Sequence, residues 1–290
     1  MPERDFLHRF LFEQLAVRGE IVQLDATWRT VLERRAYPPA VRRVLGEASA
    51  AAALLAATIK FAGRLTLQIQ APGPLRLLVV QVTGERTLRA LARWEGQPEM
   101  AALSDLCGGG RLILTLDPGQ GREPHQGVVS LTGETLASAL EDYFARSEQL
   151  PTRIRLAADE RFAAGLLLQR MPEAPSNDGD GWNRLATLAA TLRPAELLEL
   201  DPTTLLHRLF HAEDLRRFAP EAFSFRCNCS RERTASMLLA LGTDELRETS
   251  DEHGDLHVDC EFCGHRYTFD SIDIAGLLAG CPPDACALRH

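Results

Sequence analysis

Four of the seven cysteines form two close pairs, and this arrangement constrains the fold more than any other feature of the chain. Cys227 and Cys229 make the first pair and Cys260 and Cys263 the second, with thirty residues between the pairs and Gly264 directly after Cys263. Zinc prefers four soft ligands in a tetrahedron, and two short-range pairs supply four thiolates without a large loop-closure cost within either pair. The spacing predicts a site for one Zn²⁺ per chain.

The cysteine set is compatible with two interpretations that do not exclude each other. One is a permanent structural zinc site, and the other is a metal site that also senses oxidants. An extended Cys227–Cys229 pair would place its α-carbons roughly 6.6 to 7.2 Å apart, at or beyond the usual disulfide limit of about 6.8 Å. Oxidation there would therefore bend the chain. Basic residues near the sulfurs would favour thiolates or balance the charge of a tetrathiolate site: Arg226, Arg231, Arg233, His265 and Arg266.

The composition of the chain bounds its class and its partners. With 290 residues, 45% of them hydrophobic and 25% charged, it fits a globular protein with one sizeable domain and a smaller one. The net charge of -8 argues against general nucleic-acid binding. The apolar run at residues 48–59 is too short to span a bilayer, and the start of the chain lacks a signal-peptide pattern, so we expect a cytoplasmic protein with no membrane partner.

The sequence cannot contain a nucleotide-binding P-loop. Lys60 is the only lysine and it follows Ile59, so the Gly-Lys-Ser/Thr end of that motif cannot be assembled. P-loop nucleotide hydrolysis is therefore excluded.

Residues 1–172 predict an α+β core domain of mixed sheet and helix. Alternation over residues 65–70, a turn at 71–74 and an apolar run at 75–82 predict a hairpin, and residues 111–116 and 127–131 predict a second strand pair. The alanine-rich run before Lys60 and residues 136–147 predict helices. Residues 173–225 are expected to form a helical linker region, with one helix over 182–192 and another that starts at Pro202. The apolar stripes of these helices need a covering surface, on the core or on the cysteine module.

Residues 226–290 carry six of the seven cysteines and predict a small zinc-binding domain. We expect a helix from Ser230 to Gly242, another from Thr243 to about residue 254, strands on either side of a knuckle at 260–265, and a last helix capped by Asp270. A domain of about sixty residues is marginal on hydrophobic burial alone, so bound metal would contribute a decisive part of its folding free energy.

Other reactive side chains carry weaker signals. Cys281 and Cys286 could form an extra redox pair, and Cys107 is expected to be a packed small hydrophobe. His207 and His211 lie four residues apart on one predicted helix, but no third ligand is evident, so surface histidines are the better interpretation. No Ser-His-Asp set or carboxylate pair stands out. We therefore expect no enzyme and no catalytic residue.

Two segments around the cysteines, and several upstream, resemble one known family. They are residues 223–233 (FSFRCNCSRER), 260–269 (CEFCGHRYTF), 17–20 (VRGE), 143–152 (YFARSEQLPT) and 205–211 (LLHRLFH). In these residues the chain resembles the 33 kDa chaperonin family of redox-regulated heat-shock holdases, over nearly its whole length.

The resemblance implies a function and its site. It implies an inactive reduced form with zinc on Cys227, Cys229, Cys260 and Cys263, and activation by oxidants. It further implies that these become two disulfides, Cys227 with Cys229 and Cys260 with Cys263, that zinc is released, and that the switch domain and linker unfold. The active form of the family is a homodimer that binds unfolding clients without ATP. The chain departs from the pattern by carrying Cys281 and Cys286 beyond the motif, which leaves the disulfide count of the oxidised state open.

Two other classes of function are kept as alternatives. A zinc-ribbon nucleic-acid module would predict a basic face, whereas the chain is acidic. A thiol-disulfide oxidoreductase using Cys260 and Cys263 would predict a thioredoxin-like βαβ context, which the strand-knuckle-strand pattern does not provide.

Overall fold

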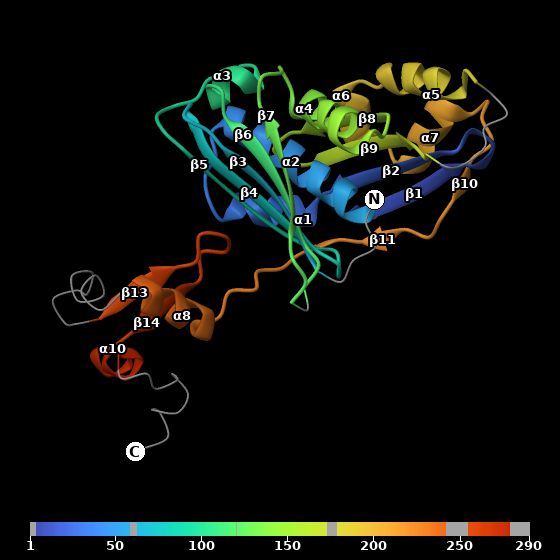
Figure 1. The fold of residues 1–290 in the computed structure, drawn as a ribbon. Helices are drawn as coiled ribbons and strands as arrows, with labels where there is room; N and C mark the ends of the chain where they lie inside the picture. Colours follow the sequence, from blue (N-terminus) through green and yellow to red (C-terminus); the bar gives the residue numbers. More distant parts are fainter. Residues whose placement is uncertain (1–3, 59–62, 120, 173–178, 242–254, 279–290) are drawn as a thin grey trace. The chain divides into compact units, whose positions relative to one another are not determined.

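The computed structural model describes residues 4–58, 63–119, 121–172, 179–241 and 255–278. Contacts divide the chain into two compact units, Met1–Arg226 and Cys227–His290. The first unit contains two β-sheets with helices, and the described residues of the second form a hairpin and two helices (Figure 1). The predicted α+β class is confirmed. Within the described part of the chain, no helix combines the length and the apolar character needed to cross a bilayer.

The first sheet is antiparallel and has the order β10-β1-β2-β9-β8, with β11 also paired to β1. Its short strands are β10 (Arg216–Arg217) and β11 (Glu221–Ala222). Its four long strands are β1 (Phe6–Phe12), β2 (Val17–Leu24), β8 (Thr152–Ala158) and β9 (Ala163–Arg170). Seven of the eight residues of β2 are buried, and so are seven of the eight in β9. These central strands lack the alternation of a half-exposed strand because helices cover both faces of the sheet.

The second sheet has the order β12-β5-β4-β3-β6-β7, in which β12 (Ser224–Phe225) is a short edge strand. Its five long strands are β3 (Arg64–Gln70), β4 (Leu75–Thr83), β5 (Thr87–Trp94), β6 (Arg111–Asp117) and β7 (His125–Ser130). The predicted hairpin is confirmed as β3 with β4, and the second predicted pair as β6 with β7. Every second side chain of β3 is buried, so the alternation in its sequence reflects one covered face.

A long alanine-rich helix, α2 (Pro39–Thr58), packs against strands of both sheets and confirms the predicted helix (Figure 1). Alanines allow a close approach of helix and strand. The same closeness is visible at Gly165 on β9, where an added Cβ would lie 2.7 Å from a methyl carbon of Leu54. The principal hydrophobic core lies around α2, between the sheets.

Further helices of the first unit border this core: α1 (Ala26–Glu33), α3 (Leu103–Cys107), α4 (Leu136–Tyr143) and the π-helix η2 (Phe144–Glu148). The short 3₁₀ helix η1 (Glu13–Leu15) instead places Leu15 in the apolar cluster on the outer face of the first sheet. The helix predicted over 136–147 is therefore present, but its last turn is wider than an α-helix. Thr135 caps α4 by accepting a hydrogen bond from the backbone N–H of Ser138.

The outer face of the first sheet is covered by α5 (Gly181–Ala190), α6 (Pro194–Glu199) and α7 (Pro202–Phe210). Both helices expected in this region are present, whereas α6 was not predicted. Their apolar side chains pack on Phe10, Phe12 and Leu168 of the sheet, with the Phe12 and Phe210 rings 5.2 Å apart. Of the two covering surfaces considered for these helices, the core is the one that the structure shows.

After α7 the chain becomes extended and forms a segment that we call the strap, residues 216–226. It contains β10 (Arg216–Arg217) and β11 (Glu221–Ala222), which pair with β1, and β12 (Ser224–Phe225), which pairs in parallel with β5. The strap therefore joins an edge of the first sheet to an edge of the second, immediately before Cys227. These short strands were not predicted.

The second unit contains α8 (Arg231–Leu241), the hairpin of β13 (Leu256–Asp259) and β14 (Arg266–Phe269), and α10 (Ser271–Leu278). The helix after Ser230, the two strands and the last helix are confirmed. The helix predicted from Thr243 lies outside the described residues, as do Gly242 and Gly280. A small core joins the elements: Ala235, Leu238, Leu256, Phe269, Ile274 and Leu277.

Candidate metal centre

The second cysteine pair lies in the tight turn between β13 and β14. The backbone N–H groups of Cys263 and Gly264 both donate to the carbonyl oxygen of Cys260, and the N–H of Cys260 donates to the carbonyl of His265 at 2.9 Å. Gly264 has a φ of +71°, a left-handed conformation that glycine adopts without strain. Gly264, directly after Cys263, therefore allows the chain to reverse while both sulfurs stay on the same side of the turn.

The first cysteine pair immediately precedes α8. Ser230 accepts a hydrogen bond at its hydroxyl from the backbone N–H of Arg233, at 3.3 Å, and its carbonyl accepts from Thr234. The Arg233 side chain donates to the carbonyl oxygen of Asn228 at 2.6 Å, which fixes the residue between the two cysteines. Helix capping and this arginine thus orient the Cys-Asn-Cys segment.

The fold brings all four sulfur atoms together. They lie within 4.8 Å of one another, and all four side chains are partly buried. Cys227 Sγ is 3.6 Å from Cys260 Sγ, and Cys229 Sγ is 3.4 Å from Cys263 Sγ, so each short contact joins one pair to the other. None of the four cysteines is in a disulfide. A tetrahedral zinc with bonds of about 2.3 Å needs sulfurs about 3.8 Å apart, so the donor set fits such an ion.

The electrostatics of the site differ from what the flanking basic residues predict. Burial is the main cause that raises the pKa of the Cys260 and Cys263 thiols above the ordinary value, and sulfur neighbours contribute to the same effect. Arg231 is paired with Asp273 at 2.5 Å and Arg266 with Asp259 at 2.7 Å. The expected lowering of the thiol pKa is therefore not found at these two cysteines. A divalent cation would supply the positive charge that thiolates need in this setting.

Tyr267 is a residue of the site that the sequence alone did not indicate. Its hydroxyl donates to Cys229 Sγ at 3.1 Å, and its ring packs edge to face with His265, with centroids 4.5 Å apart. Hydrogen bonds to the ligands orient a metal site and tune its affinity. The feature of the sequence that could have indicated Tyr267 was the alternation of β14, which places Tyr267 opposite Val258 in the hairpin.

The other candidate residues lie elsewhere. Cys107 is fully buried in the core of the first unit, as expected, and burial raises the pKa of its thiol to about 11. The rings of His207 on α7 and His211 just after its end are 5.7 Å apart, and both histidines are exposed. Among the described residues, the four cysteines are the one group with metal-binding geometry. Cys281 and Cys286 lie outside the described residues.

Comparison with known proteins identifies the family. The family model of the Hsp33 protein matches residues 5–270, from the first strand to the end of the cysteine hairpin. This chain belongs to the Hsp33 family. A relative called 33 kDa chaperonin, from Nitrosococcus oceani, is 52% identical over 277 residues, which cover 96% of this chain and 95% of the relative. A protein of the same name from Methylobacillus flagellatus is 45% identical and covers the same shares.

A solved structure extends the Hsp33 likeness to three dimensions. The 33 kDa chaperonin of Thermotoga maritima, also called heat shock protein 33 homolog, matches with a TM-score of 0.81 at 25% identity. The match covers 96% of this chain and 99% of that one. Membership of the Hsp33 family supports a chaperone function for the chain.

Proposed function

We propose that this chain is a redox-regulated chaperone that binds unfolding proteins without ATP and is inactive while reduced. In the inactive state, Cys227, Cys229, Cys260 and Cys263 hold one Zn²⁺. The observation that carries the proposal is the convergence of four cysteine sulfurs, from two segments thirty residues apart and in no disulfide, into one site of tetrahedral size. Bound zinc would neutralise thiolate charge and join α8 to the β13–β14 hairpin.

Activation is an oxidation of the four ligands. Each of two peroxide molecules accepts two electrons from a cysteine pair and, with two protons, yields two waters, while one sulfur–sulfur bond forms. We propose the pairs Cys227 with Cys229 and Cys260 with Cys263. Both disulfides remove thiolate ligands, so zinc is released. The short contacts across the pairs make Cys227 with Cys260 and Cys229 with Cys263 the alternative products, and mapping the disulfides by mass spectrometry distinguishes the two sets.

Loss of the metal would unfold the second unit because its own core is small. In the described residues that core consists of six buried apolar side chains, four of them on helices. Few apolar contacts remain when the ion that joins the segments is gone. The proposed domain organisation is a core at 1–172, a linker at 173–225 and a switch domain at 226–290.

The linker would transmit this unfolding to the core surface. The strap follows α7 and ends at Arg226, next to the first ligand, and its backbone pairs with β1 and β5. Once these short pairings are lost, α5 to α7 can leave the first sheet. The uncovered face contains Phe10, Phe12 and Leu168, and exposed apolar area of this kind binds unfolded chains.

The proposal is tested by measuring zinc, free thiols and chaperone activity in one titration. Mild peroxide should release one zinc per chain, remove at least the four ligand thiols and produce suppression of client aggregation without nucleotide. Replacing the four ligands with serine should abolish the zinc content and the response to peroxide. Cys107→Ala, a variant at a buried thiol outside the site, should respond as the unchanged protein does. Aggregation suppression that is the same in the four-serine variant and the parent, both reduced and oxidised, would overturn the switch.

The proposal includes partners and location. Clients are unfolded or oxidatively damaged proteins, the active form is a homodimer, and the compartment is the reducing cytoplasm, where free thiols persist. Sedimentation before and after peroxide tests the predicted change in mass.

A further inference from the structure

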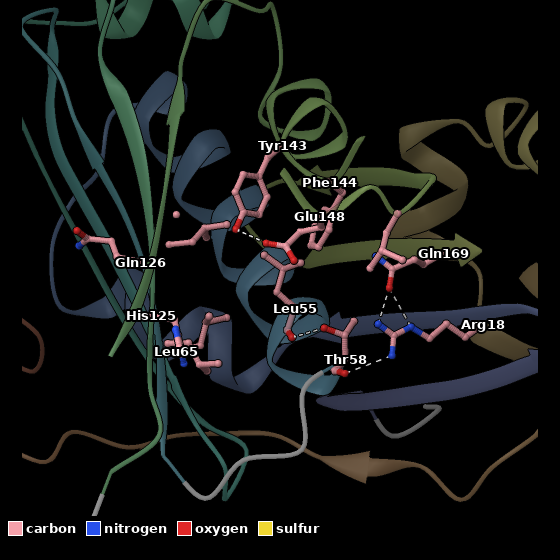
Figure 2. Close-up of a pocket in the computed structure, with 14 residues that line it drawn as sticks. Arg18, Leu55, Thr58, Leu65, His125, Gln126, Tyr143, Phe144, Glu148 and Gln169 are labelled. Carbon is pink, nitrogen blue, oxygen red and sulfur yellow. Dashed lines mark hydrogen bonds between the residues drawn. The ribbon is translucent and has the colours of Figure 1, made fainter. Parts of the chain in front are cut away.

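A cavity of about 520 Å³ lies in the first unit between the two sheets, distant in sequence from the four candidate ligand cysteines (Figure 2). Its walls come from β2 and β9 of the first sheet, β3, β6 and β7 of the second, the end of α2, and the π-helix η2. Protein interiors are close-packed, and cavities of this size are typical of small-molecule sites. Single-turn π-helices are also frequent at functional sites. The cavity therefore needs an explanation beyond imperfect packing.

The apolar part of the lining comes from the second sheet, the end of α2, η2 and the loop before β8. The apolar members are Leu55, Leu65, Leu114, Leu116, Phe144 and Leu150. Such a surface favours a hydrocarbon chain over water because burial of apolar area is favourable.

Arg18 gives the cavity a positive charge. The side chain is half-buried and extends from β2. Its Nη1 donates to the carbonyl oxygen of Thr58 at 3.2 Å, and its Nε and Nη2 donate to Gln169 Oε1. These bonds use three of the five guanidinium N–H groups, and all three go to neutral acceptors. The guanidinium thus has donors left for an anion.

The guanidinium is held in place before any ligand arrives. The Gln169 amide nitrogen donates to the hydroxyl of Thr152 at 2.9 Å, and that hydroxyl donates to the carbonyl of Leu150 at 2.9 Å. This series of hydrogen bonds orients Gln169 Oε1 toward Arg18. Figure 2 shows the hydrogen bonds between Arg18 and Gln169. A charged group with a fixed orientation binds an anion at a lower entropic cost.

Two acidic groups must be weighed against an anionic ligand. Glu148 lines the cavity, and its carboxylate accepts a hydrogen bond from the Tyr143 hydroxyl at 2.7 Å. Glu20 lies two residues beyond Arg18 on β2, and burial raises its pKa to about 7. Near neutral pH, Glu20 therefore neutralises the Arg18 charge only in part, while Glu148 opposes an anion from the other wall.

We propose that the cavity binds a small amphipathic carboxylate, with the carboxylate on the free N–H groups of Arg18 and the hydrocarbon chain among the leucines and Phe144. The apolar lining excludes bare inorganic anions, and the guanidinium selects a charged head over a neutral one. This site is independent of the metal centre and of the redox switch.

The test is calorimetric titration of the full-length reduced protein with decanoate, and with decanol and inorganic phosphate as comparison ligands. Decanoate should bind saturably, with one site per chain, about tenfold tighter than decanol, because a charge-assisted hydrogen bond is lost with the alcohol. Phosphate should show no saturable binding. Equal affinity for decanoate and decanol, or no saturable binding of decanoate, would overturn the proposal.

Variants distinguish the effect of the Arg18 charge on binding from an effect of misfolding. Arg18→Met keeps a long apolar side chain and should weaken decanoate binding about tenfold, and Arg18→Lys should restore part of it. Glu148→Gln replaces an exposed residue and should tighten decanoate binding, so the proposal stays testable even where Arg18→Met fails to fold. Arg29→Met, at a largely exposed arginine on α1, is the matched control and should leave binding unchanged. Unchanged binding in both Arg18→Met and Glu148→Gln would overturn the assignment of the head group.

Discussion

Replacing Glu20 with glutamine should stabilise the protein at alkaline pH and have little effect at acidic pH. Glu20 is 3% exposed in the centre of the first sheet, and its Oε2 has no hydrogen-bond partner among the described residues. Burial raises its pKa from 4.5 to about 7, although the charges of Arg18 and Arg9 act in the opposite direction. The carboxylate is therefore costly to keep ionised in the folded chain.

The magnitude follows from the two pKa values. Between about pH 4.5 and 7, the folded protein binds this proton more tightly than the unfolded chain does, so the free energy of unfolding falls as pH rises. Above pH 7 the ionised Glu20 lowers the free energy of unfolding by its full amount. The difference between the ordinary pKa of 4.5 and the folded-state pKa of about 7 corresponds to about 3 kcal/mol. Glutamine has nearly the same shape and carries no charge, so the substitution removes this cost.

The assay is urea unfolding of the reduced protein at pH 5 and at pH 8, followed by the fluorescence of tryptophans, including the buried Trp28. Glu20→Gln should raise the free energy of unfolding by up to about 3 kcal/mol at pH 8 and by much less at pH 5. Glu99→Gln, at an exposed position, is the control and should have no effect at either pH. A gain of the same size at both pH values, or a loss at pH 8, would refute the reasoning.

Three further substitutions test other parts of the structure. Glu221→Gln removes the charge that joins the strap to Arg9 and Arg86, so we expect the strap to open about 1 to 2 kcal/mol more easily, measured as faster hydrogen exchange over residues 216–226. Phe210→Ala removes a ring that is 1% exposed and should cost about 3 to 5 kcal/mol in urea unfolding; a cost below 1 kcal/mol would contradict the packing. Tyr267→Phe removes the hydroxyl bond to a ligand sulfur and should weaken zinc binding about tenfold to a hundredfold in competition with a chelator; unchanged affinity would show that the bond is not needed.

The sequence was most informative where the signal is local. The alternation over residues 65–70 predicted β3, because one face of that strand is covered and the other is not. The helical stripes at α5 and α7 were also clear, since each presents one apolar side to a single surface. The same signal fails in β2 and β9, whose residues are buried on both faces and show no alternation.

The strap shows a second limit of local reasoning. Its strands are two residues long, and each depends on a partner strand more than a hundred residues away in the chain. The charge pairing of Glu221 with Arg9 and Arg86 is equally non-local. No periodicity can indicate contacts of this kind, because two-residue strands contain less than one repeat.

At the candidate metal centre, the spacing of Cys227, Cys229, Cys260 and Cys263 was sufficient to nominate the ligands, since a short Cys-x-Cys or Cys-x-x-Cys segment can present both sulfurs to one ion in almost any fold. Only the tertiary structure decided that the four sulfurs lie within 4.8 Å, that Tyr267 donates to one of them, and that Arg231 and Arg266 are paired with aspartates. It also decided that Glu20 is buried and that Arg18 faces a cavity. The physical reason is that ligand spacing is a property of a few neighbouring residues, whereas burial and charge pairing depend on segments that only folding brings together.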